Sequence, residues 1–596
     1  MSAAHTPPRP RAVLRVGVLG HRLTRLLQSD VDLACVRIHV RAALEEVRRL
    51  AEQAVTECAD VYHGPLRLLV VSSLDDGAEQ VAVEEAMELG YVLHAPLPSD
   101  AEQYATTFER PAAPSTVDPV TTFDRLIRRA ESVQVIDGRP SVVVDCAARA
   151  AAGRCVLRHS DILVAVWDGT SHSSRDRTAD VIAQARAWQI PMVVVDPRSP
   201  QASRGRHGDS TGEPGIAAAV RAALTPPDPN PDDHGRDRLR QYLRTRPARG
   251  VGGLFASTVK LVAWERPVTP RVVTLGPSIA RARAEWHALW NRPIPVDPAI
   301  AHPINRTLGD YYVWADGLAN RFGTLHRDTS TAPFVLALLA ALLAAHIGNQ
   351  AVLIAPVVAA WLVFLLYRRA VAAKYHDRWI DYRSLAEQLR QLAFLWPLGR
   401  PLRALRIRGE SASEAPQFAW IGWYARAVAR EAGLFPCVFT PERLTECRAM
   451  LIERFIAPQW AYHNRTVKRF QTVQRRLHGI ALALFWAALV LATVRLVINT
   501  TSRHWVLEAA AAAAILLPAA AAAVHGFLGL GDFSNLARRS KRMAEELRPL
   551  STVSATGATP QGIEELGDMA EAAAEVMGEE VLNWRVFVRL KGPSLG

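Results

Sequence analysis

The stretch "AVLRVGVLGHR" at residues 12–22 decides how the first third of the chain folds. A short run of apolar and β-branched residues contains Gly17 and ends at Gly20, and two polar residues, His21 and Arg22, follow at once. Such a run is typical of a buried strand. Glycine near its end lets the backbone turn tightly and approach a phosphate group. An ordinary turn between a strand and a helix is the alternative interpretation of the two glycines.

Strand-like and helix-like patterns alternate from residue 11 to residue 196. The strand-like run "LRLLVVSSL" (66–74) is followed by the helix-like "GAEQVAVEEAMELG" (77–90). Further along, "DILVAVWDG" (161–169) precedes "TADVIAQARAWQI" (178–190). Apolar strands that alternate with helices are typical of a parallel sheet with helices on both faces. The predicted fold class of this region is therefore α/β, Rossmann-like, with a parallel sheet.

The predicted strands end in polar residues and glycine. Because ligands bind parallel α/β sheets outside the carboxyl ends of the strands, we expect these residues to line one crevice. Free amides at the starts of the following helices favour an anion such as phosphate. Asp168 is placed to accept from a ribose hydroxyl, although a turn or helix-cap aspartate is an equal alternative. The set comprises Gly17, Gly20, His21, Arg22, Ser72, Ser73, Asp76, Gly77, Trp167, Asp168, Gly169, Arg177 and Thr178.

Two pairs of apolar segments lie in the second half of the chain. The first pair occupies residues 333–367 and meets at "GNQ"; the second consists of residues 477–497 and 505–530. The second pair is long enough to cross a membrane, whereas both runs of the first pair are short for a full span. The scarcity of polar residues still predicts two transmembrane hairpins, with a buried helical hairpin as the alternative for the first. Arginine and lysine flank both pairs and are scarce in the connecting turns. The positive-inside rule then predicts a multi-pass protein of the cell inner membrane, with both termini cytoplasmic.

These patterns divide the chain into eight segments. A similar order of helix, hairpin and helix occurs around both apolar pairs, which indicates an internal duplication; the alternative is that any membrane hairpin has amphipathic flanks. The predicted segments are a disordered N-terminus (1–10), the α/β domain (11–196), a flexible linker or insertion (197–250), a connecting helical segment (251–332), the first hairpin with a cytoplasmic helix (333–400), a cytoplasmic helical segment (401–476), the second hairpin with its helix (477–550) and a tail with a helix (551–596).

The composition of the chain favours some classes of partner and site and argues against others. The net charge of +12 comes mostly from arginine and indicates an anionic partner. No nucleic-acid-binding motif is present, and arginine beside apolar segments points first to lipid headgroups. Six scattered cysteines, without a CxxC pair or a set of histidine partners at the spacing of a metal site, argue against a metal site and a disulfide framework. The N-terminus has no apolar run typical of a secretory signal.

Several stretches resemble, in order, the SLOG branch of the Rossmann-like LOG/DprA superfamily. They are "VGVLGHR", "SSLDDGAEQVAVEEAMELGY", "LPSDAEQYATTF", "SDILVAVWDG" and "RTADVIAQARAWQIPMVVV", across about residues 11–196. Members of that branch cleave nucleoside monophosphates or sense nucleotide-derived signals. The fusion to hairpins resembles the bacterial SMODS and SLOG-associating two-TM effectors of anti-phage signalling. The resemblance implies a nucleotide or NAD-derived ligand, a lipid bilayer and a homo-oligomer as partners, with no cofactor.

The chain departs from the family pattern where the family binds phosphate. Ser73 stands where glycine is common, and Asp176 and Arg177 stand where two glycines are expected. Loss of those glycines hinders close approach of the backbone to a phosphate, although Arg177 is able to pair with one. The family's acidic residue corresponds to Asp180. If the domain is catalytic, Asp180 and Arg154 are the candidate catalytic residues.

Three functions follow in order of preference. The first is a membrane-anchored sensor of a nucleotide-derived ligand that acts on the membrane, in anti-phage or stress signalling. The second is a membrane-tethered nucleotide N-glycosidase or phosphoribohydrolase. The third is a transporter or a scaffold, which is disfavoured because few polar groups accompany Pro356 and Pro518 in the apolar segments.

Overall fold

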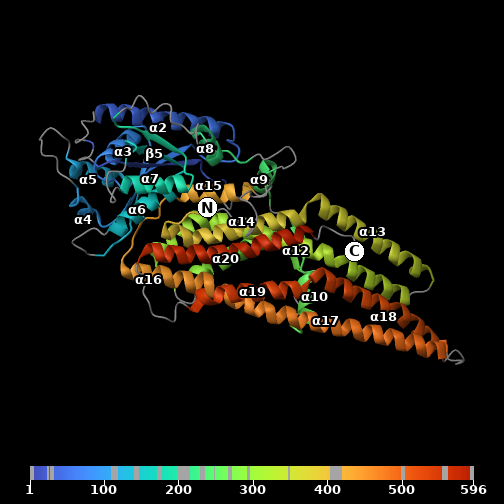
Figure 1. Cartoon of the computed structure of the whole chain (residues 1–596). Helices are drawn as coiled ribbons and strands as arrows, with labels where there is room; N and C mark the ends of the chain where they lie inside the picture. Colours follow the sequence, from blue (N-terminus) through green and yellow to red (C-terminus); the bar gives the residue numbers. More distant parts are fainter. Residues whose placement is uncertain are drawn as a thin grey trace.

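The chain consists of an α/β sheet and an elongated array of long helices (Figure 1). The computed structural model describes residues 6–22, 26, 33–108, 118–139, 146–170, 177–198, 215–227, 235–246, 249–265, 271–291, 295–346, 349–402, 419–497, 504–552 and 562–590. The predicted site residue Arg177 opens a helix, but its side chain lies outside the described part, as do Asp176 and residues 199–214, 228–234 and 247–248 of the predicted linker.

Seven parallel strands form the main sheet, in the order β6-β5-β1-β2-β3-β4-β9. The strand order runs in one direction from β1 to β4 and in the other from β1 through β5 to β6, as in doubly wound sheets. The predicted parallel α/β sheet is therefore confirmed. The strands are β1 (Val13–Gly20), β2 (Arg67–Val71), β3 (Val92–Leu97), β4 (Ser132–Val135), β5 (Ile162–Val166), β6 (Met192–Val195) and β9 (Cys437–Val438).

Helices cover both faces of this sheet. In α2, the buried residues Val36, Val40, Leu44 and Val47 recur at spacings of three and four and turn one stripe of the helix toward the sheet. Figure 1 shows α2 on the face opposite to α14 and α15. The helices of this part are α2 (Leu33–Thr56), α3 (Ala78–Glu88), α4 (Ala101–Ala105), α5 (Pro119–Arg129), α6 (Cys146–Arg158), α7 (Arg177–Ala187), α8 (Ile216–Leu224) and α9 (Gly235–Leu243).

The segments predicted as disordered or flexible contain ordered parts. Within the predicted N-terminus 1–10, the carbonyl oxygens of Pro8 and Arg9 accept hydrogen bonds from the Tyr424 and Tyr311 hydroxyls. Within the predicted linker 197–250, α8 buries Val220 and Leu224 against the core of the sheet. Apolar burial and hydrogen bonds to distant aromatic residues hold both segments in place.

The C-terminal half completes the sheet. Strand β9 pairs with β4 in the register Gln134↔Cys437 and Val135↔Val438. One hydrophobic cluster runs from Ala12 at the start of β1 and Cys155 in α6 into the long helices. The helices of this half are α10 (Leu254–Val262), α11 (Leu275–Asn291), α12 (Pro298–His346), α13 (Asn349–Ala372), α14 (Tyr375–Leu395), α15 (Ala419–Ala432), α16 (Pro441–Met450), α17 (Ala457–Val497), α18 (His504–Gly531), α19 (Phe533–Thr552) and α20 (Ile563–Leu590). Shorter elements are the 3-10 turn Trp396–Leu398, the π-helical turn Leu451–Ile456, and the antiparallel pair β7 (Arg249–Gly252) and β8 (Arg271–Thr274).

Three helical segments among the described residues are long and apolar enough to cross a membrane. They are Ile354–Ala372, Pro441–Val494 and Ala512–Ser551. Large apolar side chains on these helices face outward: Trp361 is 61% exposed and Phe485 57% exposed. Outward apolar faces of this extent are typical of contact with lipid. The remaining apolar segment of the four that were predicted is the first in the chain. It forms the apolar end of α12 and is shorter than a full span.

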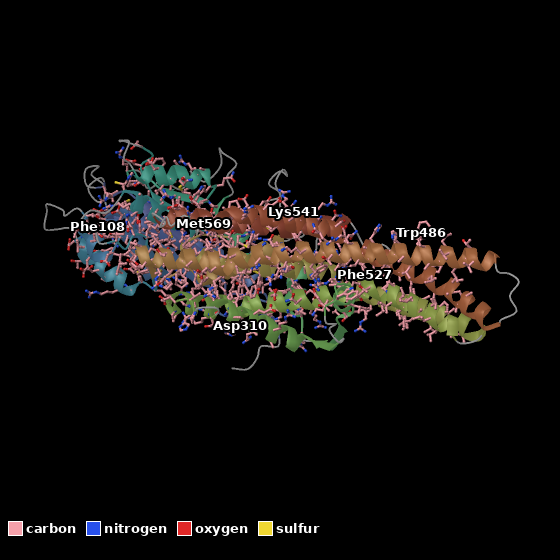
Figure 2. The ribbon with its side chains drawn as sticks, turned by 90° about the horizontal axis from the view of Figure 1, so that it is seen from below. Phe108, Asp310, Trp486, Phe527, Lys541 and Met569 are labelled. Atoms are coloured by element: carbon pink, nitrogen blue, oxygen red, sulfur yellow. The ribbon has the colours of Figure 1, made fainter. Side chains whose placement is uncertain are left out.

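The apolar helices lie together and extend away from the sheet. Figures 1 and 2 show α13, α17, α18 and the end of α12 at the end of the molecule opposite to the strands. Phe334 of α12 packs directly against Gly526 of α18, where a larger side chain would collide with its ring. The predicted order of helix, apolar pair and helix is seen twice, as α12–α13–α14 and α17–α18–α19.

Replacing Gly20 with valine is expected to destabilise the fold whether or not a ligand is present. A Cβ at Gly20 would lie 2.5 Å from the Cβ of Ala78 and 3.2 Å from that of Val166, so strand and helix must separate. Overpacking of this kind costs about 1–3 kcal/mol. Thermal unfolding of the full-length protein in detergent, followed by tryptophan fluorescence, measures the loss. Gly479→Ala in α17, where nothing lies within 4 Å, is the control and should not lower stability.

Candidate ligand site at the carboxyl edge of the sheet

The structure brings together the strand ends that the sequence analysis selected. Strand β1 lies between β2 and β5, in the registers Gly17↔Val71 and Gly20↔Val166. The backbone at the end of β1 forms hydrogen bonds with the first turns of α3, which follows β2, and of α7, which follows β5. The His21 carbonyl accepts from the Ala78 amide of α3 at 3.0 Å, and the Gly20 carbonyl accepts from the Thr178 hydroxyl of α7 at 3.3 Å. We therefore treat this edge as the candidate ligand site.

His21 and Asp168 form the buried centre of the edge. The His21 Nε2 atom lies 3.1 Å from Asp168 Oδ1 and 3.2 Å from the Asp168 backbone nitrogen, and both side chains are 2% exposed. This nitrogen donates to the carboxylate when it is protonated and accepts from the amide when it is not. The amide and hydroxyl of Thr170 donate to the same carboxylate oxygen, while Arg198 pairs with the other at 3.2 Å. Asp168 thus organises the turn after β5.

Arg22 is held by acidic neighbours. Its Nε donates to Asp76 Oδ1 at 2.5 Å, and its Nη2 lies 3.3 Å from Asp75 Oδ1. The Nη2 atom also donates to the Thr107 carbonyl at 3.0 Å. The Asp76 carboxylate is fully buried, whereas Arg22 keeps 29% of its side chain exposed. An incoming phosphate must therefore compete with these carboxylates for the guanidinium group.

Ser72 and Ser73 surround a carboxyl group that the sequence analysis did not select. Their hydroxyls donate to Glu79 Oε2 at 2.7 and 3.0 Å, and the Asp75 amide lies 3.3 Å from the same oxygen. Burial, and secondarily the charge of Asp75, raises the pKa of Glu79 to about 8. A proton therefore resides on this carboxyl at neutral pH. The signal in the sequence was an acidic residue in the first helical turn after two serines at a strand end.

Glycine occupies the four predicted positions for two different physical reasons. Gly77 begins α3 with a φ of 105°, and Gly169 turns after β5 with a φ of 79°. Both angles lie in the region that favours glycine. Gly17 and Gly20 instead lack room for a side chain, because a Cβ would collide with Ser160 or with Ala78. Close packing of β1 thus accounts for these two glycines without a ligand.

The remaining predicted residues lie apart from this centre. Trp167 is covered by the Arg186 guanidinium at 5.3 Å, and its indole nitrogen has no hydrogen-bond partner among the described residues. Asp180 is exposed in the first turn of α7. The Arg154 guanidinium turns to Glu564 of α20 at 3.3 Å. Within the described part of the chain, no group of three or more His, Cys, Asp or Glu side chains is arranged to hold a metal ion.

Stability is expected to fall with pH through the titration of Glu79. The carboxyl keeps its proton in the folded chain up to about pH 8, whereas it ionises near 4.5 when unfolded. Its contribution to stability is therefore fully present below the unfolded pKa and is lost as the pH rises through the folded one. Glu79→Gln keeps the serine contacts and removes this dependence.

The difference in melting temperature between Glu79→Gln and the unmodified protein should thus grow between about pH 5 and about pH 8. Thermal unfolding of the full-length protein across this range measures it. Glu88→Gln, at a side chain that is 63% exposed, is the control. A constant difference across the range would contradict a raised pKa at Glu79.

Comparison with known proteins gives one partial match. The family model described as a protein of unknown function (DUF4231) matches residues 310–399. That range covers most of α12, all of α13 and α14 and the turn that follows. No curated protein matches the chain. The match contains the first apolar pair and does not extend to the sheet, so the resemblance of residues 11–196 to SLOG domains stays a prediction.

Proposed function

We propose that this chain is a membrane-anchored sensor of a nucleotide-derived ligand and acts as an effector on the lipid bilayer. The ligand binds at the carboxyl edge of the sheet, and the apolar helices are the part that acts on the membrane. Bacterial anti-phage or stress signalling is the setting that the resemblance to SLOG-associated effectors implies.

The observation that carries this proposal is a hydrophobic core that joins residues beside the sheet to the first part of α12, the helix that continues into an apolar segment. Helix α12 buries Trp314 and Leu318 in the cluster that also contains Ala12, the residue before β1. The same helix continues without a break to the apolar residues ending at His346. A displacement of the elements beside the sheet therefore reaches the membrane segment through packed side chains. Such packed elements switch between discrete arrangements rather than deform continuously.

An ion-pair cluster adds a second connection between the sheet part and the array of long helices. Glu564 of α20 pairs with Arg158 of α6 at 2.8 Å and with Arg400 at 3.2 Å, and Arg154 approaches the same carboxylate. Burial favours the neutral form of Glu564, but these guanidinium groups lower its pKa overall. The side chain of Arg400 is only 2% exposed, so the pair contributes more than a solvated surface contact. Helix α6 of the sheet is thereby tied to α20.

The chemistry of the strand ends suits a phosphorylated ribose. Arg22 offers a guanidinium group, and Ser73 and Thr178 offer hydroxyls beside the N-termini of α3 and α7. A phosphate that draws Arg22 away from Asp75 and Asp76 would also release those carboxylates. This exchange gives the ligand different interactions in two states, which is the requirement for a switch.

The proposal includes two transmembrane hairpins formed by the apolar parts of α12 with α13 and of α17 with α18. Positively charged residues lie where these parts join the rest of the chain, as at Arg368 and Arg369 near the end of α13 and at Arg475 and Arg476 before the second pair. By the positive-inside rule the sheet and both termini face the cytoplasm of a cell bounded by this inner membrane.

A nucleotide N-glycosidase or phosphoribohydrolase is the second candidate. Glu79 favours it, because a buried carboxyl with a pKa near neutrality at a strand edge suits proton transfer. The candidate catalytic residues argue against it, since Asp180 is exposed and Arg154 pairs with Glu564.

The test uses the full-length protein in detergent with NAD, ADP-ribose and its cyclic forms, cyclic di- and trinucleotides, and AMP. Thermal shift and product formation are recorded together. A shift without product supports the sensor, and product formation supports the enzyme. A folded protein that gives neither result would refute nucleotide binding by this chain.

Arg22→Ala is expected to weaken binding of whichever nucleotide gives the shift. Loss of one charge-assisted hydrogen bond costs about 1.5–3 kcal/mol, which is about a tenfold to hundredfold loss of affinity. Titration calorimetry measures the change. Arg48→Ala is the matched control, because Arg48 lies at the surface, where it pairs with Glu52 and donates to the Leu89 carbonyl. Equal affinities for the two variants would place the ligand elsewhere.

Glu564→Gln is expected to uncouple the sheet part from the long helices while leaving the ligand site at the strand edge intact. The substitution removes the charge that holds α6 to α20 but alters no residue of the strand edge. The nucleotide should still shift the melting temperature, whereas ligand-dependent leakage of dye from vesicles containing the protein should fall. Glu575→Gln, at an exposed position of the same helix, serves as the control. Full leakage with Glu564→Gln would exclude this connection as the route.

A further inference from the structure

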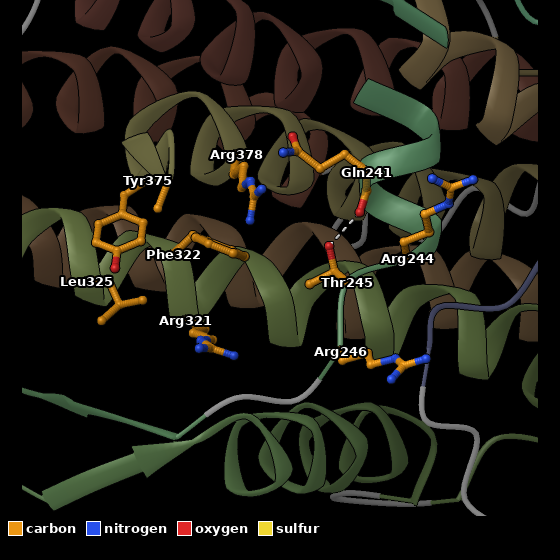
Figure 3. A pocket seen from close by; sticks show the side chains of 10 residues that line it. Gln241, Arg244, Thr245, Arg246, Arg321, Phe322, Leu325, Tyr375 and Arg378 are labelled. Carbon is orange, nitrogen blue, oxygen red and sulfur yellow. Dashed lines mark hydrogen bonds between the residues drawn. The ribbon is translucent and has the colours of Figure 1, made fainter. Parts of the chain in front are cut away.

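A second candidate site lies far from the strand ends, in an open cavity of about 460 Å³ between α9, α12 and α14. Figure 3 shows its side chains reaching in from three elements: from the end of α9 and the residues after it, from α12, and from the start of α14. The lining residues are Gln241, Arg244, Thr245, Arg246, Arg321, Phe322, Leu325, Ala373, Tyr375 and Arg378.

The cavity carries four positive charges and no carboxylate among its lining residues. None of its four arginines forms an ion pair with any residue in the described ranges. Arginines elsewhere in the chain are commonly paired, as Arg383 is with Asp316 and Glu387 in the same helices. The positive charge of this cavity is therefore unbalanced by the protein itself.

Arg321 is the most informative of these residues. Its side chain belongs to a residue that is only 9% exposed, and its Nε has no hydrogen-bond partner in the described part of the chain. Burial, together with the neighbouring charge of Arg378, lowers the pKa of Arg321 below its ordinary value. A buried guanidinium without a partner costs free energy, and an anion in the cavity would offset that cost.

The geometry around Phe322 holds two guanidinium groups in place. Arg321 lies 5.7 Å and Arg378 5.2 Å from the centroid of the Phe322 ring. Stacking on an aromatic ring orients the planar guanidinium group and leaves its N–H groups directed outward. Each oriented guanidinium group offers paired N–H donors, which suit the oxygens of a phosphate in a bidentate manner.

The cavity lies where a candidate membrane span ends. Ala373 and Tyr375 line it, and they follow the apolar segment Ile354–Ala372 directly. Lys374 between them adopts a φ of 48°, so the chain turns sharply at this point before α14 begins. Phosphate groups of lipids lie at the boundary of the apolar layer, at the level reached by the end of such a span.

We propose that this cavity binds the phosphate group of an anionic lipid headgroup, with Arg321 and Arg378 as its principal donors and Arg244 and Arg246 at its rim. The chemistry recognised is a negatively charged phosphate, which a free nucleotide also presents. Position at the end of the apolar segment favours the lipid as its source. The site is separate from the strand edge and does not depend on the function proposed for that edge.

The experiment uses the full-length protein in nanodiscs of phosphatidylcholine alone and of an equal mixture of phosphatidylcholine and phosphatidylglycerol. Native mass spectrometry counts the phosphatidylglycerol molecules retained, and thermal unfolding records stabilisation. Arg321→Met and Arg246→Met are compared with Arg306→Met, an exposed arginine of α12 outside the cavity. We expect the two cavity variants to bind phosphatidylglycerol about tenfold more weakly, and the control to bind it normally.

The melting temperature of Arg321→Met also distinguishes a binding role of Arg321 from a purely structural one. In phosphatidylcholine alone, this variant should melt no lower than the unmodified protein, because it removes a buried charge that has no partner. A clear loss of stability there would overturn the proposal, since it would mean that Arg321 stabilises the fold itself. If the variant does not fold, the exposed Arg246→Met decides the lipid measurement.

A parallel titration with inorganic phosphate and AMP in detergent distinguishes the two sources. Binding of these probes that depends on Arg321, without retention of phosphatidylglycerol, would overturn the lipid as the source and leave a site for soluble phosphate. Equal behaviour of the Arg321→Met and Arg306→Met variants toward every probe would overturn the site. Arg22→Ala should leave retention of phosphatidylglycerol unchanged, which separates this test from that of the strand edge.

Discussion

Burial of one apolar cluster shared by the sheet and the long helices is the constraint on which the rest of this structure depends. Trp290, Trp420, Trp423 and Tyr242 are fully buried in it. Each large side chain removed from water contributes about 1.5–3 kcal/mol. The ring of Trp423 in α15 lies 5.8 Å from that of Tyr62, between α2 and β2, so the sheet part cannot separate from α15 without exposing this contact. For this reason α12 leaves the core in a defined direction and places the apolar segments at the far end of the molecule.

The same cluster explains a buried charge beside β1. Arg430 of α15 is 3% exposed and donates to the Ala223 carbonyl at 2.5 Å, while Asp161 lies 3.9 Å away. Burial lowers the pKa of Arg430, and the carboxylate of Asp161 acts in the opposite direction. Because a buried guanidinium must be paired, α15, α8 and the start of β5 are held in one arrangement. A connection of this kind transmits displacement, whereas a flexible linker would absorb it.

The sequence predicted the features that depend on local pattern. The run at residues 12–22 predicted β1, and the alternation of apolar runs with helical stripes predicted the parallel sheet. Strand β9 escaped prediction because two residues, Cys437 and Val438, carry no periodicity; they are a strand only because β4 offers an unpaired edge. Glu79 escaped because its role depends on how the loop from Ser72 folds back around it. The role of Gly20 was predicted as approach to phosphate, and contact with Ala78 is an equally sufficient cause.

The two candidate sites differ in whether their charged side chains are paired within the protein. That difference bears on what each site can do. Among the described side chains of the strand edge, Arg22 is paired with Asp76, and His21 contacts Asp168. A ligand there must exchange one set of contacts for another, which is how binding becomes a change of conformation. In the cavity beside Phe322 the arginines have no such partners among the described residues, so an anion adds contacts without breaking any. A site of the first kind is suited to switching, and a site of the second kind is suited to anchoring. The candidate of the first kind lies at the sheet and that of the second kind at the end of an apolar helix, which is the order that the proposed membrane-anchored sensor requires.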